Sequence, residues 1–430
     1  MSDRITSVVG RRVWDSRGRP TVETEITLAS GCTGRAIAPA GASTGSAEAV
    51  DLRDGGDAFG GYDVQSALRA VNGEIAALLG GRDVMQQAEL DAALISLDGT
   101  PNKGRLGGNA LVATSLAIAH AAAAAQELPL WRHLGAGRED FFLPLPEVQI
   151  FGGGAHAGRR VDVQDFMIIA VGAADYAQAL EWTAEVYRAA GRLMADAGLL
   201  AGVADEGGWW PAFDNNEAAL DFLLRAIERA GYTPGQEVAI SLDIAATDFG
   251  RGGRYRLARD AREIDSDGMC EMLLGWLARY PIVAIEDPLA EDDAEGLRKF
   301  SAAAGSGIEV VADDFICTNA SRIAGAATLG ACNTALIKPN QAGTVSETRA
   351  ALDAARAAGW QSIVSARSGE TEDVSVVHLA VGWGVKQLKV GSFARSERMA
   401  KWNEGLRIAE ALRQTGGNLP PRASFPWGGA

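Results

Sequence analysis

Six charged residues end successive apolar segments in the last two thirds of the chain: Asp243, Glu286, Asp313, Lys338, Arg367 and Lys389. If those segments are strands of one parallel barrel, their carboxyl ends meet on one face, where such barrels build active sites. Charges gathered so closely need one another, or a ligand, for neutralisation. The alternative is a set of unrelated helix caps and surface ion pairs.

Three of the six are carboxylates, and no histidine or cysteine adjoins them in the sequence. Oxygen ligands of this kind suit Mg²⁺, so Asp243, Glu286 and Asp313 predict a magnesium site. Two lysines and an arginine would stand beside the cation. Positive neighbours lower the pKa of a lysine from its reference value of about 10.4, which lets a lysine act as a general base. Such a site can take a proton from carbon next to a carboxylate, because the cation stabilises the resulting negative charge.

A general acid is the remaining requirement. Glu206 lies in the segment VADEGGWWP, where the glycines that follow it favour an exposed, close-fitting turn. The segment 363–373, IVSARSGETED, has the composition of an anion site: it places Ser365, Arg367 and Ser368 at the end of an expected strand. An arginine offers a planar fork of donors to a phosphate or carboxylate. A loop arginine that only forms a salt bridge is the competing interpretation.

Two glycine-rich loops carry further polar candidates. GASTG places Ser43 and Thr44 among glycines, as expected for a mobile lid whose hydroxyl reaches a metal or phosphate, or for a plain connector. The segment FGGGAHAGRRVDVQDF holds several groups that could line the same cavity: His156, Arg159, Arg160, Gln164 and Asp165. Read locally, that segment is equally a glycine loop with a structural histidine that leads into a strand.

These residues need a scaffold, and the pattern predicts an α/β protein. Two antiparallel strands and a helical stretch from about 64 to 135 indicate a small α+β domain over residues 1–135. Residues 140–430 then alternate short apolar strands with amphipathic helices, which favours a parallel (β/α)8-like barrel. The expected strands are 161–170, 237–245, 282–288, 308–315, 334–340, 361–368 and 387–392.

Composition limits the partners. The 430 residues carry a formal charge of -15, which argues against nucleic acid or an anionic membrane as the main partner and favours a small anionic molecule bound by local cations. Four scattered cysteines without a CxxC pair are typical of a cytoplasmic protein. The N-terminus has no secretory pattern, and no window approaches 18 uninterrupted apolar residues, so neither secretion nor a membrane span is expected.

The motifs WDSRGRPTVE, GASTG, GGAHAG, DVQDFMI, ADEGG, SLDIAA, IEDPLAEDD, VADDF, IKPNQAGT, SARSGETED and ARSERMAKWN resemble those of the enolase family, in its order and at similar spacing over nearly the whole chain. The resemblance implies an enolase-type barrel after a small α+β domain, a homodimer or higher oligomer, and two Mg²⁺ ions. The barrel's first strands and helices would depart from regular alternation.

The resemblance also implies a role for each matching residue. Asp243, Glu286 and Asp313 would hold the first Mg²⁺, and Ser43 would help to hold the second. Lys338 would remove the C2 proton, Lys389 would stabilise the enediolate, and Glu206 would protonate the leaving C3 hydroxyl. Arg367 and Ser368 would bind the phosphorus group, with Gln164 and His156 lining the cavity.

Several positions depart from the family pattern. Ala366 stands where enolases have histidine, Asp165 where they have glutamate, and Gly152 where they have asparagine. An arginine pair, Arg159 and Arg160, follows the histidine loop, and the bulky Trp210 replaces a small residue. Because the departures spare the metal ligands, base and acid, we expect the elimination chemistry to be retained.

The departures predict a changed substrate. Loss of an imidazole leaves room, and an arginine of the pair could bind an additional anion. We therefore expect a 2-phosphoglycerate relative with a larger anionic phosphorus substituent, as in the enolase-like enzymes of phosphonate antibiotic biosynthesis. The alternatives are an ordinary enolase that uses 2-phospho-D-glycerate, and an inactive paralogue that only binds a ligand or partner.

Overall fold

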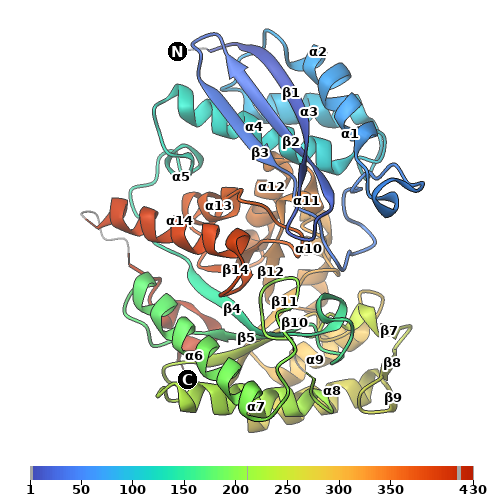
Figure 1. Ribbon diagram of the computed structural model, residues 1–430, viewed down its shortest axis with the longest axis vertical. Helices are drawn as coiled ribbons and strands as arrows, with labels where there is room; N and C mark the ends of the chain where they lie inside the picture. Colours follow the sequence, from blue (N-terminus) through green and yellow to red (C-terminus); the bar gives the residue numbers. More distant parts are fainter. Residues whose placement is uncertain (1–2, 211, 414–417, 430) are drawn as a thin grey trace.

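An antiparallel sheet of three strands opens the protein, in the order β1-β2-β3 (Figure 1). The computed structural model describes residues 3–210, 212–413 and 418–429. The strands are β1 (Ile5–Trp14), β2 (Pro20–Leu28) and β3 (Thr33–Ile37). In the turn between β1 and β2, Asp15 Oδ1 accepts hydrogen bonds from the amides of Arg17 and Arg19, both at 2.8 Å. The sequence predicted the first two strands and missed β3.

Helices pack on one side of this sheet, as the helical stretch predicted: α1 (Gln65–Ala70), α2 (Ala76–Leu79), α3 (Gln87–Asp98), α4 (Gly108–Ala125) and α5 (Leu130–Leu134), with a π-helical turn, η2 (Val71–Ile75), between α1 and α2. The alanine-rich α4 contacts β2 and β3 closely. It is long and apolar enough to cross a membrane, but 83% of it is buried within the protein. Its small side chains make it a core helix.

A closed barrel of eight strands follows, in the order β10-β11-β12-β13-β14-β4-β5-β6. Its strands are β4 (Leu145–Gly152), β5 (Asp165–Ile169), β6 (Ala239–Asp243), β10 (Ile282–Glu286), β11 (Glu309–Ala312), β12 (Thr334–Ile337), β13 (Gln361–Ser365) and β14 (Gln387–Ser392). The predicted α/β barrel is confirmed. All seven expected strands form, two to five residues shorter than their predicted ranges except β14, which matches.

Two features differ from a regular parallel barrel. β4 is absent from the expected strands, yet it forms with Pro146 inside it and pairs with β14. β5 runs antiparallel to both neighbours, β4 and β6. The connection from β4 to β5 is a short loop without a crossover helix, so β5 must return in the opposite direction. The parallel barrel predicted from the strand pattern is therefore wrong at β5, whereas the departure in the first strands that the resemblance implied is present.

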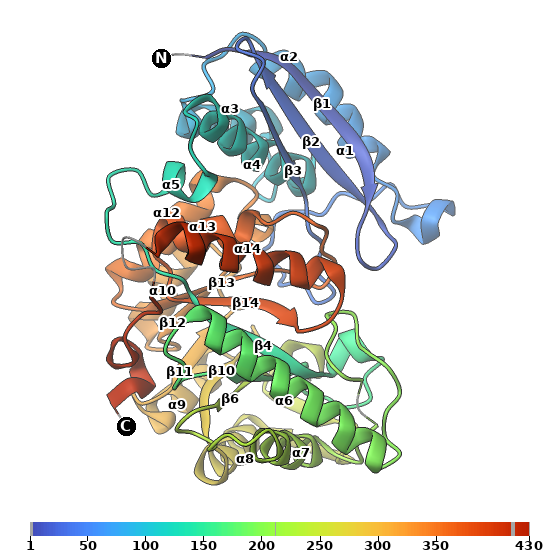
Figure 2. The ribbon, with the colours of Figure 1, turned by 60° about the vertical axis from the view of Figure 1, so that its left-hand side comes forward.

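Helices and a small sheet surround the barrel: α6 (Tyr176–Asp196), α7 (Asn216–Arg229), α8 (Ser266–Arg279), α9 (Ala294–Ala304), α10 (Ala320–Leu329), α11 (Pro339–Ala342), α12 (Val345–Ala357), α13 (Ser375–Trp383), α14 (Ser396–Leu412), and the sheet β7 (Gly250–Arg251), β8 (Arg254–Leu257) and β9 (Arg262–Asp265). Short 3₁₀ turns occupy Ala58–Gly61, Gly154–Ala157, Ala246–Asp248, Arg422–Ser424 and Pro426–Gly429. α14 contacts α13, α6 and β14 (Figure 2).

Strand register brings the charged residues together. Asp165 on β5 lies opposite Asp243 on β6, and Asp243 lies opposite Glu286 on β10. On the other side of the barrel, Ser365 on β13 lies opposite Lys389 on β14. Three carboxylates therefore end three neighbouring strands, although β5 contributes its first residue and the other two contribute their last.

Candidate active site

Lys389 is the centre of the charged cluster. Its Nζ lies 2.7 Å from Asp243 Oδ2, 2.8 Å from Glu286 Oε2 and 3.7 Å from Asp165 Oδ2. All four side chains are buried. Gln164 adds a hydrogen bond of 3.0 Å from Nε2 to Asp243 Oδ2, so the structure assembles three strand-end carboxylates around one ammonium group.

Burial and neighbouring charge set the protonation of this cluster. Burial disfavours the charged form of Lys389, but the carboxylates of Asp243 and Glu286 raise its pKa well above the usual value. Burial works against ionisation of Asp243 as well, yet Lys389 lowers the pKa of that carboxyl overall. The pKa of Glu286 is raised by burial and by the charge of Asp243. Glu286 Oε1 is buried without a hydrogen-bond partner among the described residues.

Lys338 forms a second buried pair, with Asp313. Its Nζ donates a short hydrogen bond to Asp313 Oδ2, while Gln341 Nε2 donates to Oδ1 at 2.8 Å. Burial lowers the proton affinity of Lys338, but Asp313 outweighs it, so the pKa of Lys338 is raised. Neighbouring cations were expected to lower this pKa, and the pairing with Asp313 acts in the opposite direction. The carboxylates expected to bind a cation also form ion pairs with the two lysines.

The donor set fits a hard divalent cation. Asp243, Glu286 and Asp313 offer only carboxylate oxygens, and the unpartnered Oε1 of buried Glu286 is a lone pair open to a ligand. Among the described residues, one group of three acidic side chains has ligand atoms that all lie within 4.8 Å of one another: Asp287, Asp313 and Asp314, which shares only Asp313 with the predicted set. Asp287 accepts the amides of Asp313 and Asp314, both at 2.9 Å, so it shapes the backbone that presents Asp313.

Arg367 lines the cavity from the segment that follows β13. Its Nη1 donates to Glu48 Oε2 at 2.9 Å and to Asn340 Oδ1 at 3.0 Å, and its Nη2 donates to the carbonyl of Ser43 at 3.0 Å. A Cβ at Gly41 would lie 2.1 Å from Nη2, so only glycine allows the loop to approach this closely. The GASTG loop thus lies directly against the predicted anion site.

Buried cations of α14 hold the strand end that carries Arg367. Arg398 donates to the carbonyls of Arg367, Ser368 and Val390, and it is fully buried. Lys401 lies 3.0 Å from Glu370 Oε2. These supporting residues were not predicted, although both lie in the motif ARSERMAKWN. Glu48 and Gln341 were also missed, because nothing local marks them as partners of Arg367 and Asp313.

Glu206 lies on a sharp turn whose backbone is fixed on several sides. The amide of Ser392 donates to the Glu206 carbonyl at 2.9 Å, and the hydroxyl of Tyr187 donates to the Gly207 carbonyl at 2.8 Å. Gly207 has φ 91°, which favours glycine.

One small cavity is lined by most of the predicted site residues: Ser43, Gln164, Asp165, Glu206, Asp243, Lys338, Ala366, Arg367, Ser368 and Lys389.

Comparison with known proteins agrees with this geometry. Residues 5–134 match the family model "Enolase, N-terminal domain", and residues 140–418 match "Enolase, C-terminal TIM barrel domain". A protein named "Enolase" from Acidothermus cellulolyticus is 46% identical over 408 residues, covering 95% of this chain and 94% of its own. The chain belongs to the enolase family. It is accordingly a carbon–oxygen lyase of the hydro-lyase class.

Against the enolase pattern, the arginine pair does not reach the cavity in this structure. Arg159 Nη1 donates to the Asp248 carbonyl at 3.3 Å, and the side chain is 62% exposed. Its guanidinium lines a separate hollow with Phe249 and Tyr255. Arg160 lies over the ring of Trp210, 4.5 Å from its centroid. The expectation that either arginine binds substrate has no support from this geometry, and the side chain of His156 lies outside the described residues.

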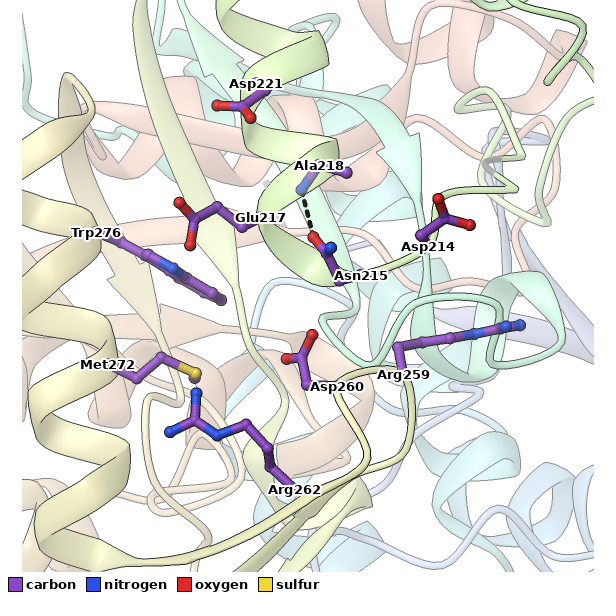
Figure 3. A pocket seen from close by; sticks show the side chains of 10 residues that line it. All are labelled: Asp214, Asn215, Glu217, Ala218, Asp221, Arg259, Asp260, Arg262, Met272 and Trp276. Carbon is purple, nitrogen blue, oxygen red and sulfur yellow. Dashed lines mark hydrogen bonds between the residues drawn. The ribbon is translucent and has the colours of Figure 1, made fainter.

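A larger hollow lies apart from the enolase-type cavity, between the start of α7 and α8 (Figure 3). It mixes charges of both signs with apolar groups: Asp214, Asn215, Glu217, Ala218, Asp221, Arg259, Asp260, Arg262, Met272 and Trp276. Asn215 caps α7 by accepting the Ala218 amide at 2.8 Å. Of the predicted site residues that the structure describes, none lines this hollow, and ten of them line the small cavity instead.

Proposed function

We propose that this enzyme eliminates water from a 2-phosphoglycerate derivative whose phosphorus carries a larger anionic substituent, giving carboxyphosphonoenolpyruvate. Ala366 is the observation that carries the proposal. It lies on the cavity wall directly before Arg367, where the family places an imidazole. A methyl group there leaves space beside the predicted phosphorus site that a plain phosphate does not need.

Each polar residue then has one task. Lys338 takes the proton from C2, and Glu206 gives a proton to the leaving C3 hydroxyl. Lys389 offsets the negative charge that develops on the substrate carboxylate. Arg367 and Ser368 bind the phosphorus oxygens. Asp243, Glu286 and Asp313 would hold one Mg²⁺ and Ser43 would help to hold a second; the bound ions would supply charge that stabilises the deprotonated substrate.

A second candidate is ordinary enolase activity on 2-phospho-D-glycerate. It is favoured by the name of the Acidothermus relative at 46% identity. Steady-state kinetics with Mg²⁺ separates the two, using 2-phospho-D-glycerate and its phosphonoformyl analogue as parallel substrates. We expect a higher kcat/KM for the analogue. Efficient turnover of 2-phospho-D-glycerate alone would establish the second candidate.

We also propose that the enzyme is a homodimer. Support comes from exposed aromatic groups on the N-terminal sheet and the loop beside it. Trp14 is 50% exposed and Phe59 is 45% exposed, they pack edge to face, and Arg12 lies over both rings. Exposed aromatic and arginine side chains are typical of interface centres. Light scattering coupled to gel filtration measures the mass directly, and a monomeric mass would contradict this proposal.

A further inference from the structure

Gln149 on β4 is a fully buried amide that joins two parts of the active site. Its Nε2 donates a short hydrogen bond to Asp165 Oδ1, and its Oε1 accepts the amide of Gly208 at 2.9 Å. A carboxylate can only accept here and a backbone amide can only donate, so the two partners fix the orientation of the side-chain amide. No other orientation would satisfy both groups.

The two partners belong to different segments of the site. Asp165 lies 3.7 Å from Lys389 and opposite Asp243 in the strand register. Gly208 lies two residues after Glu206, on the same turn. A Cβ at Gly208 would lie 2.3 Å from Gln149 Oε1, so the turn approaches the amide as closely as glycine allows. The Gln149 side chain therefore connects Asp165, in the carboxylate cluster around Lys389, to the turn that carries Glu206.

Main-chain bonds reinforce the same junction. The Trp209 amide donates to the Ile150 carbonyl at 2.8 Å, and the Gly152 amide donates to the Trp209 carbonyl at 3.1 Å. The turn is thus attached to β4 through its backbone. Gln149 adds a link from that backbone to Asp165, a carboxylate beside Lys389. Asp165 is one methylene shorter than the glutamate that enolases have there, so a long partner is needed to reach it.

We propose that Gln149 is a positioning residue for proton donation: it fixes the turn of Glu206 relative to Asp165 and the lysine–carboxylate cluster. The inference rests on the proposed function, in which Glu206 acts as the acid. Gln149 does not touch the base Lys338 in any contact that the structure shows for it. Removal of the C2 proton should therefore survive loss of this amide, while loss of the C3 hydroxyl should not.

Gln149→Met tests this, because methionine is close in size and makes neither hydrogen bond. We expect deuterium exchange at C2 to stay within about threefold of wild type while product formation falls about 100-fold with little change in KM, the scale of lost acid catalysis. Gln387→Met is the matched control: Gln387 is also fully buried in the barrel and bonded to a carboxylate, Glu309, at 2.9 Å. Equal loss of exchange and product formation, or no loss of either, would overturn the inference.

Hydrogen–deuterium exchange of the protein amides gives a readout that needs no substrate. Gln149→Met should remove the protection of the Gly208 amide and leave that of distant barrel strands unchanged. Unchanged protection at Gly208 would also overturn the inference. If wild type neither exchanges the C2 proton nor forms product from either substrate, the proposed function fails, and the amide measurement still decides whether Gln149 fixes the turn.

Moving one methylene between the partners provides a second test if Gln149→Met folds poorly. Gln149→Asn should leave a gap to Asp165, and Asp165→Glu should crowd Gln149. Each single variant is expected to lose about tenfold or more in kcat, and the double variant should recover most of that loss, because contacting residues are strongly non-additive. Losses that simply add in the double variant would contradict a direct spatial match between the two side chains.

Discussion

The guanidinium of Arg367 donates two hydrogen bonds to the carboxylate of Glu48, 2.9 Å from Nη1 to Oε2 and 3.1 Å from Nη2 to Oε1. Burial lowers the proton affinity of the guanidinium, but Glu48 outweighs it and raises the pKa of Arg367 above its usual value. Glu48 comes from the segment after the GASTG loop. The N-terminal part of the chain, through Glu48, therefore fixes the orientation of the guanidinium that is predicted to bind the anion, before any substrate arrives.

Arg367→Lys should raise KM about 10- to 100-fold, because lysine keeps the charge but cannot form the planar two-point contact. Steady-state kinetics on the preferred substrate measures this. Arg349→Lys is a suitable control, since Arg349 pairs with Asp353 at 3.0 Å on the exposed side of α12. An unchanged KM in Arg367→Lys would remove Arg367 from the phosphorus site.

Lys338→Ala should lower product formation about 1,000-fold or more and abolish deuterium exchange at C2, because general-base catalysis is worth roughly 100- to 10,000-fold. Both readouts should fall together, in contrast to Gln149→Met. Product formation at the wild-type rate would show that another group removes the proton.

Ala366→His should shift preference toward 2-phospho-D-glycerate by filling the space beside Arg367. The measurement is the ratio of kcat/KM for the two substrates. Ala358→His places the same side chain at an exposed helix end and should leave the ratio unchanged. A ratio that is also unchanged in Ala366→His would count against the substrate proposal.

Removal of divalent cations with a chelator should abolish activity, and added Mg²⁺ should restore it. Asp243→Asn is expected to raise the Mg²⁺ concentration for half-maximal activity about tenfold or more, because an amide is a weaker, neutral ligand for a hard cation. A titration of activity against Mg²⁺ checks both statements. Full activity in the presence of the chelator would exclude Mg²⁺ dependence.

Glu309 should make the protein less stable as pH rises. Burial raises the pKa of this carboxyl to about 8, and its Oε1 has no hydrogen-bond partner among the described residues. An unfolded glutamate has a pKa of about 4.3, so between these values the folded state holds a proton that the unfolded state has lost. Stability therefore declines with rising pH across this window, by at most about 1.4 kcal/mol per pH unit.

Glu309→Gln should flatten that decline, because glutamine stays neutral at every pH. Thermal unfolding at several pH values between 5 and 8 measures the slope, with the range set by the reference value and the raised pKa. Glu295→Gln, at an exposed position on α9, provides the comparison. Parallel curves for wild type and Glu309→Gln would show that Glu309 is ionised in the fold.

Much of the site could be predicted because strand ends in a barrel obey a simple geometric rule. The grouping of Asp243, Glu286 and Lys389 could be predicted from the positions of their strands alone. In the structure, Lys389 Nζ lies within 2.8 Å of both carboxylates. No such rule applies to Arg159, because it lies on a loop; in the structure its guanidinium lies 3.7 Å from the carboxylate of Asp248. β4 was missed because two prolines within three residues are a boundary signal, which pairing to β14 overrides.

Gln149 could not be identified beforehand for a different reason. Its role depends on Asp165, sixteen residues away on an antiparallel strand, and on a turn from a third part of the chain. Neither the reversal of β5 nor the closeness of Gly208 is encoded in local pattern. Lys338 shows the same limit, since its pKa depends on contact with Asp313 at the end of the neighbouring strand.

The buried position of Arg398 has a consequence for how the enzyme is made. Residues near the start of the chain contact 368–370: the Ser16 hydroxyl bonds to the Ser368 carbonyl at 3.3 Å. The same carbonyl is held by Arg398, thirty residues further on. During synthesis the anion site cannot be completed until α14 has left the ribosome. Nascent chains that already contain every proposed metal ligand, base and acid should therefore be inactive, and truncation before α14 should abolish activity without removing a single reacting group.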